Sequence, residues 1–192
     1  MQNLPGRVLL TRGQIETRVG ELGAQIASDL QDELRREGSN ETQTDRVVLI
    51  PVLTGAVVFV ADLIRKMPLH LSMEMVSVSS YPGATTESKG ALLRGALPKD
   101  LEGKHVLIVD DILDTGQTLS LLQRLVREQS PASLRTCVLL TKECKRVEYA
   151  EAEYSGFDIE PEFVVGYGLD YNGHYRNLPE ICVLDPAYRD EA

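Results

Sequence analysis

Hydrophobic residues recur every three or four positions over residues 14–37, and this period predicts an amphipathic helix near the start of the chain. Its apolar side is formed by Ile15, Val19, Leu22, Ile26, Leu30 and Leu34. The small polar residues at positions 38–40 favour the end of this helix. The next apolar run, residues 46–52, is rich in β-branched side chains and therefore predicts a buried strand.

Residues 54–90 contain a predicted turn and helix, then a strand, then a long loop. Thr54 and Gly55 predict a turn, and residues 56–67 a buried helix. Leucine and methionine then alternate with polar residues over 69–75, which predicts a half-buried strand. Residues 79–90 are small and polar and include Gly and Pro, so we expect a long loop of the kind that often covers an active site.

The rest of the chain alternates between strand and helix patterns. Strands are predicted at 105–110, 134–140, 163–167 and 181–184, and a helix at 117–128. This alternation predicts an α/β fold, a mostly parallel sheet flanked by helices on both faces. Without an internal repeat or a clear linker, we expect residues 1–192 to form a single domain. The N-terminal segment and about residues 142–192 would form a small hood over the sheet.

Composition excludes several classes of protein. The net charge of −9 argues against a general nucleic-acid binder, which needs a basic surface. No apolar run approaches the roughly 20 residues that span a bilayer, and no signal peptide is evident, so no membrane partner is expected. The three cysteines include no C-x-x-C pair and fit reduced thiols. We therefore expect a cytoplasmic protein.

The candidate chemistry lies in residues 106–119, VLIVDDILDTGQTL. A strand pattern runs into two carboxylates, then a third, and a Thr-Gly-Gln-Thr turn opens the next helix. Ligands of open α/β sheets bind at the carboxyl ends of the strands, where this turn would lie. Gly116 allows a tight turn, and the threonine hydroxyls and unpaired N–H groups of the helix start favour an anion.

A purely structural interpretation of this segment is also open. Asp114 or Thr115 could cap the helix, while Asp110 and Asp111 face solvent. Three carboxylates within five residues, however, repel each other by roughly 1 kcal/mol or more. A cation or a ligand rich in hydroxyl groups would offset that repulsion.

The same segment resembles the PRPP (5-phosphoribosyl 1-pyrophosphate) motif of the type I phosphoribosyltransferases: four hydrophobic residues, two acids, two hydrophobic residues and Asp-Thr-Gly-x-Thr. The resemblance implies that fold, with a hood and a flexible lid. It also implies that Asp114 is the catalytic base, which takes a proton from N7 of a purine. The PRPP-binding residues that it implies are Asp110, Asp111, Asp114, Thr115, Gly116, Gln117 and Thr118.

Three further segments resemble the hypoxanthine-guanine branch of that family. Residues 53–56 resemble its pyrophosphate loop, often built on a non-proline cis peptide, and Ser80 and Tyr81 resemble the Ser-Tyr pair of its lid. Residues 163–179, FVVGYGLDYNGHYRNLP, resemble its purine and magnesium segment. The roles implied are pyrophosphate binding for Thr54, Gly55 and Arg176, purine binding for Lys142, Phe163 and Val164, and Mg²⁺ binding for Asp170 with Asp110 and Asp111.

The resemblance implies a Mg²⁺-dependent purine-salvage transferase that makes IMP or GMP from PRPP and hypoxanthine or guanine, as a homodimer or homotetramer. The chain departs from the family pattern at residues 159–162, where many members have Pro-Asp-Lys or Pro-Asp-Arg, and at Pro82. A xanthine-preferring transferase and a PRPP-sensing, RNA-binding regulator on the same fold are the alternatives. The Asp-Thr-Gly-Gln-Thr turn excludes a receiver domain.

Overall fold

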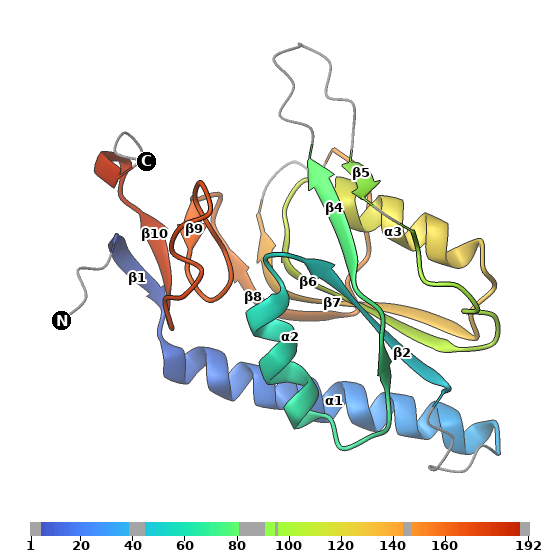
Figure 1. Ribbon diagram of the computed structural model, residues 1–192. Coiled ribbons are helices and arrows are strands. Elements are labelled where there is room, and N and C mark those ends of the chain that lie inside the picture. The colour runs from blue at the N-terminus through green and yellow to red at the C-terminus, as the bar shows by residue number, and fades with distance from the viewer. Residues whose placement is uncertain (1–4, 39–44, 81–90, 95, 144–146, 189–192) are drawn as a thin grey trace.

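Seven strands form the central sheet of the computed structural model, which describes residues 5–38, 45–80, 91–94, 96–143 and 147–188 (Figure 1). They are β2 Val47–Leu53, β3 Ser72–Met73, β4 Val76–Ser80, β5 Ala91–Arg94, β6 His105–Leu113, β7 Ser133–Lys142 and β8 Tyr154–Ile159. The order is β5-β4-β2-β6-β7-β8, with β3 paired to β2. All neighbours run parallel except β4 and β5. The mostly parallel sheet predicted from the sequence is confirmed.

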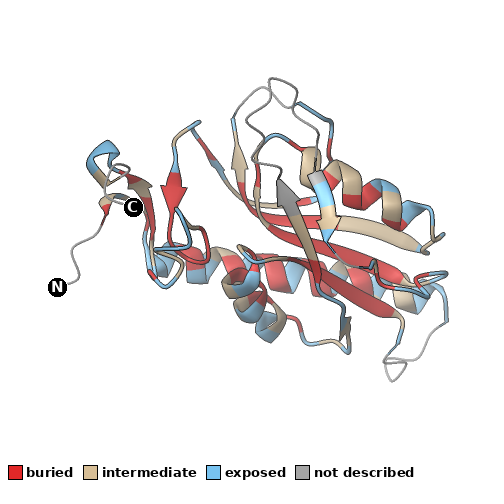
Figure 2. Ribbon diagram, turned by 45° about the horizontal axis from the view of Figure 1, so that its top comes forward, coloured by how far each residue is buried: buried red, intermediate tan, exposed pale blue. Residues whose placement is uncertain are grey.

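Helices cover both faces of this sheet. α1 (Arg12–Arg36) and α2 (Val57–Leu63), which continues as the 3-10 turn η1 (Ile64–Lys66), lie on one face, and α3 (Gln117–Arg127) lies on the other (Figure 1). Successive side chains of a strand point to opposite faces. In β2, Val47 and Leu49 therefore pack toward α1 and α2, while Val48 and Ile50 pack toward α3. The central strands are buried on both sides (Figure 2).

A capping box starts α1 two residues earlier than the apolar pattern predicts. The Gln14 N–H donates to the side chain of Thr11, and the Thr11 N–H donates 2.9 Å to the side chain of Gln14. This reciprocal pair satisfies backbone groups that the first helical turn leaves without partners. The first turn of α1 is thereby fixed directly after the first strand of the chain.

A second, smaller sheet joins the two ends of the chain. β1 (Gly6–Leu10), β10 (Ile181–Leu184) and β9 (Val164–Val165) lie in the antiparallel order β1-β10-β9, and we call them the hood sheet. β8 belongs to the large sheet. Of the described strands after residue 142, only β9 and β10 belong to the hood sheet. A 3-10 turn, η2 (Pro186–Tyr188), follows β10.

The half-buried strand predicted over 69–75 is wrong. Only β3 is formed there, and the main strand begins later, at Val76. Met73 and Met75 are 39% and 55% exposed, because no described element covers the side of the chain toward which they point. β4 also runs through Ser80, so the expected loop starts later than residue 79, and residues 81–90 lie outside the described part of the chain.

The strand predicted over 163–167 is shorter than expected. β9 holds only two residues, because Gly166 and Tyr167 adopt φ angles of 103° and 51°, which turn the chain out of the sheet. β1, β5 and β8 were not predicted, since each is short or lies at an edge of its sheet and shows little hydrophobic alternation. Among the described helices, none has the length and apolarity to cross a bilayer.

Candidate functional site

Two adjacent carboxylates close the buried part of β6. Asp110 and Asp111 lie within the strand, whose pairing with β7 continues beyond them to Leu113. Asp110 is only 6% exposed. Both residues line a cavity of about 320 Å³ at the carboxyl ends of β2 and β6. This is the edge of the sheet at which an α/β fold binds its ligand.

Burial sets the protonation of this pair. It raises the pKa of Asp110 well above the ordinary value, and the neighbouring charge of Asp111 raises it further. Burial also raises the pKa of Asp111, while Arg176 acts in the opposite direction. Burial and mutual repulsion thus oppose ionisation of the pair, and a cation or hydroxyl donors would stabilise its charged form.

The turn after β6 has the geometry of an anion cradle. Gly116 adopts φ 83° and forms the N-cap of α3. A Cβ atom at this position would lie 2.1 Å from the carbonyl oxygen of Glu148, so only glycine fits. The carbonyl of Thr115 accepts hydrogen bonds from the N–H groups of Val147 and Glu148, at 2.9 and 3.1 Å. Thr115, Gly116 and Thr118 line the cavity together with the acids.

The loop between β2 and α2 forms the facing wall of the cavity. Its Leu53–Thr54 peptide bond is cis, as the resemblance implied. A Cβ atom on Gly55 would lie 1.7 Å from Oδ2 of Asp111, and one on Gly168 would lie 2.2 Å from the carbonyl oxygen of Gly55. Three segments that are far apart in sequence therefore meet at Gly55, with no room for a side chain.

The loop after β9 brings a cation, Arg176, within electrostatic range of Asp111, although Arg176 lines a second cavity and not that of the acids. Arg176 donates to the carbonyl oxygen of Gly168 at 2.6 Å and pairs with Asp170 at 2.7 Å. The other carboxylate oxygen of Asp170 accepts from the N–H of Gly173 at 2.7 Å. Both side chains are thus held by their own loop, and the charge of Arg176 reaches Asp111.

Lys142, at the end of β7, points to the third acid of the motif. Its Nζ lies 3.0 Å from Oδ2 of Asp114. The lysine side chain is 14% exposed and the aspartate 42%, so the pair is open on the side of the carboxylate. A strong donor and a strong acceptor are presented side by side.

Two residues at the start of the hood could hold a flat ligand. Phe163 is 40% exposed and meets Tyr171 edge to face, with ring centroids 5.6 Å apart. Val164 pairs with Val183, while the N–H of Leu184 donates to the carbonyl of Phe163. In this antiparallel register, the polar backbone groups of Val164 point away from β10.

Some predicted site residues are not brought together. Gln117 starts α3 but does not line the cavity of the acids, and the same holds for Thr54, Lys142, Phe163, Val164, Asp170 and Arg176. The side chain of Ser80 and all of Tyr81 lie outside the described part of the chain. Within the described ranges, no three acidic, histidine or cysteine side chains form a metal-binding group. Asp170 therefore does not form such a group with Asp110 and Asp111.

Sequence reasoning missed Gly168, which contacts the loop between β2 and α2, and the 147–148 segment, which holds the turn at Thr115 and Gly116. Gly168 lies inside the recognised segment 163–179, so its position was available as a signal. The backbone contacts of residues 147–148 depend on no particular side chain, and no sequence signal identifies them.

Comparison with known proteins agrees with this geometry. Residues 19–172 match the model of the phosphoribosyl transferase domain family. The chain is 45% identical to a hypoxanthine-guanine phosphoribosyltransferase of Mycobacterium avium, over 93% of this chain and 85% of that protein. It is 39% identical to a protein of the same description from Bacillus subtilis, over 94% of each chain.

Solved structures give the same result. A hypoxanthine phosphoribosyltransferase of Staphylococcus aureus has a TM-score of 0.81 and 40% identity, over 95% of this chain and 92% of that one. The enzyme of Trypanosoma cruzi has a TM-score of 0.84 and 38% identity, over 97% and 96% of the two chains. The two acids of β6, the Gly116 turn and these similarities agree, and the chain belongs to the type I phosphoribosyltransferase family, in its hypoxanthine-guanine branch.

Proposed function

We propose that this protein transfers the phosphoribosyl group of PRPP to N9 of hypoxanthine or guanine, in purine salvage. The bond between C1′ and the pyrophosphate oxygen breaks, and a bond between N9 and C1′ forms. The proton on N7 of the base passes to the carboxylate of Asp114. The products are IMP or GMP and pyrophosphate.

The observation that carries this proposal is the 3.0 Å pair of Lys142 and Asp114. A 6-oxopurine carries an acceptor, O6, and a donor, N7–H, next to each other on one edge. Lys142 donates and Asp114 accepts, so the pair is complementary to that edge. Phe163, with its exposed ring, would stack on the base, and the backbone of Val164 would bond its far side.

The rest of the cavity suits PRPP. The turn from Asp114 to Thr118 would hold the 5′-phosphate at the start of α3, and Asp110 and Asp111 would hold the ribose hydroxyls. Thr54, Gly55 and Arg176 would bind the pyrophosphate. Positioning and charge stabilisation are the main work of such a site, because the transition state resembles an oxocarbenium ion and a departing anion.

Phosphoribosyl transfer requires a divalent metal, and we propose Mg²⁺. Asp110, Asp111 and Asp170 supply the hard oxygen donors that this ion prefers, and a bound cation would counteract the burial that raises the pKa of the first two. Mg²⁺ takes few protein ligands and completes its shell with water and phosphate oxygens, so three converging carboxylates are not needed. When bound, it offsets the negative charge of the leaving pyrophosphate.

One assay tests the proposal. Purified protein, PRPP and Mg²⁺ are incubated separately with hypoxanthine, guanine, xanthine, adenine and uracil, and nucleotide formation is followed by chromatography. We expect IMP and GMP. The curated relatives do not favour a xanthine-preferring enzyme or an RNA-binding regulator. Formation of XMP alone, or of no nucleotide, would contradict the proposal.

A further inference from the structure

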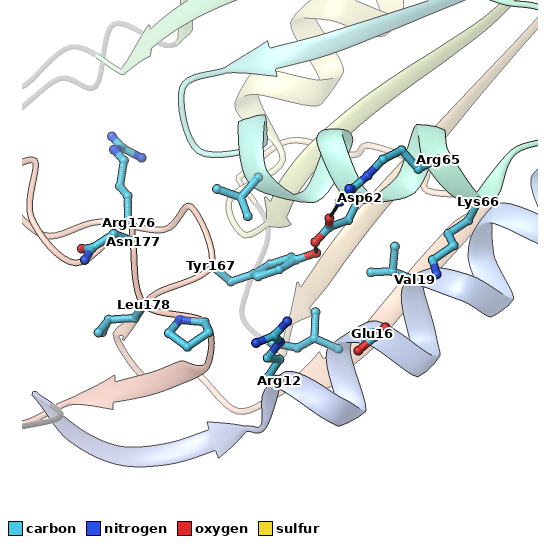
Figure 3. A pocket seen from close by; sticks show the side chains of 13 residues that line it. Arg12, Glu16, Val19, Asp62, Arg65, Lys66, Tyr167, Arg176, Asn177 and Leu178 are labelled. Atoms are coloured by element: carbon cyan, nitrogen blue, oxygen red, sulfur yellow. Dashed lines mark hydrogen bonds and ion pairs between the residues drawn. The ribbon is translucent and has the colours of Figure 1, made fainter. Parts of the chain in front are cut away.

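A hydrogen bond links α2 to the loop after β9, the two segments connected to the loops of the proposed pyrophosphate site. The hydroxyl of Tyr167 donates 2.7 Å to Oδ2 of Asp62, whose other oxygen pairs with Arg65 (Figure 3). Asp62 and Arg65 belong to α2 and the η1 turn, while Tyr167 belongs to the loop after β9. The bond lies in a cavity of about 540 Å³, which is separate from the cavity of the acids.

Asp62 and Tyr167 are each connected to one of the two loops that border the proposed pyrophosphate site. α2 begins two residues after Gly55, so its position determines the position of that loop. Gly168, the neighbour of Tyr167, is the residue that touches the carbonyl of Gly55, and it also accepts the hydrogen bond from Arg176. A displacement of Tyr167 relative to Asp62 would therefore separate Gly55 from Arg176.

Several contacts keep Tyr167 in this position. Its φ of 51° lies in the left-handed region, and its N–H donates 2.8 Å to the carbonyl of Leu178. The ring is buried, with 7% exposure. Burial, with the nearby carboxylate of Asp62, raises the pKa of the Tyr167 hydroxyl, which consequently keeps its proton and remains a donor.

We infer that Tyr167 and Asp62 are positioning residues that set the spacing of the Gly55 loop and the Arg176 loop across the pyrophosphate site. The inference rests on the proposed function, because it assumes that pyrophosphate lies between these loops. The cavity around the bond leaves this contact between α2 and the hood loop loosely packed. Removing the hydrogen bond should thus loosen the loops without unfolding the domain.

The test removes a single oxygen atom. Tyr167→Phe should raise the KM for PRPP by roughly three- to tenfold, the scale of the net contribution of one ordinary hydrogen bond. The KM for hypoxanthine should stay within about twofold, because Lys142 and Phe163 are not touched. Asp62→Ala should give the same change, and the double variant should add little to either single variant.

The chain offers a matched control. Tyr154 is equally buried, donates 2.8 Å to Asp29 and accepts from Arg135, but it starts β8, away from the site. Tyr154→Phe should lower Tm and leave the KM for PRPP unchanged. Asp62→Asn, which keeps an acceptor for the tyrosine hydroxyl, should restore most of the PRPP affinity that Asp62→Ala loses.

Different results would overturn the proposed function and the positioning role of Tyr167 and Asp62. Wild-type protein that makes no nucleotide overturns the proposed function, and the inference with it. Active wild-type protein, together with Tyr167→Phe and Asp62→Ala variants whose KM for PRPP stays within about twofold, overturns the inference alone. If Tyr167→Phe does not fold, Asp62→Ala and Asp62→Asn give the same comparison.

Discussion

The N–H of Asp111 donates a 2.9 Å hydrogen bond to Oδ1 of its neighbour, Asp110. This contact holds two carboxyl groups together at the buried end of β6. One backbone donor does not offset the loss of hydration, and the pKa of Asp110 stays well above its ordinary value. The binding site is therefore a place where the folded protein loses stability.

The first prediction concerns this loss. An acid whose pKa rises on folding holds its proton more tightly in the folded state, so stability falls as the pH rises from the ordinary value of 3.8 through the folded pKa. Asp110→Asn should therefore raise Tm at pH 7, without divalent metal, by a few degrees. About 1 kcal/mol corresponds to roughly 2–4 °C in a domain of this size.

Its control is Asp158→Asn, an exposed aspartate on β8 that changes the net charge by the same amount. Calorimetry at pH 7 should show a gain for Asp110→Asn alone. At a pH well below 3.8 the gain should disappear, because the carboxyl group of Asp110 is then neutral in both the folded and the unfolded state. Equal Tm values for both variants at pH 7 would contradict the account.

The second prediction concerns the catalytic base. Asp114→Asn keeps size and hydrogen-bonding capacity but cannot accept the N7 proton. Loss of a general base typically lowers turnover by about 10²- to 10⁴-fold. We expect a fall of this size in kcat, with a modest change in PRPP affinity by titration calorimetry. Turnover close to that of the wild type would remove Asp114 from this role.

The third prediction concerns the choice of base. Lys142 donates hydrogen bonds and accepts none, and adenine presents a 6-amino group that also donates. Two donors that face each other in a desolvated pocket cost about 1–3 kcal/mol or more. Adenine should therefore be a very poor substrate. Lys142→Ala should raise the KM for hypoxanthine without admitting adenine, and efficient AMP synthesis by the wild type would overturn the assignment.

The fourth prediction concerns the metal. Activity should vanish with a chelator and return with Mg²⁺ or Mn²⁺, because hard carboxylate and phosphate oxygens suit both ions. Asp170→Asn should raise the Mg²⁺ concentration needed for half-maximal activity by about tenfold, while Asp158→Asn should not change it. Full activity after exhaustive chelation would exclude a metal requirement.

The strength of the local pattern decides how much of the fold is predictable. α1, β2, β6, α3 and β7 follow from hydrophobic periodicity, because each is long and buries a continuous face. Edge strands such as β8 have no such face, and in the alternating segment around β3 the fold partly buries Leu69 and Leu71 but leaves Met73 and Met75 exposed. In these segments, tertiary pairing decides the secondary structure.

The candidate site shows the same division. The strand with its two acids and the Gly116 turn is local, so the sequence alone indicates it. The approach of Gly168 to Gly55, and that of Lys142 to Asp114, depend on the order of strands and on the path of the hood loop. No local pattern carries that information, although the resemblance to the family gave roles to Gly55, Lys142 and Asp114.

The pairing of β1 with β10 has a consequence for synthesis of the chain. Gly6 lies opposite Leu184, so β1 has no partner in the hood sheet until the residues of β10 have been synthesised. A nascent chain that ends before Ile181 would carry β6 and its acids but could not close the hood sheet that flanks the Arg176 loop. Closure of the hood sheet beside the binding site therefore waits for the synthesis of β10.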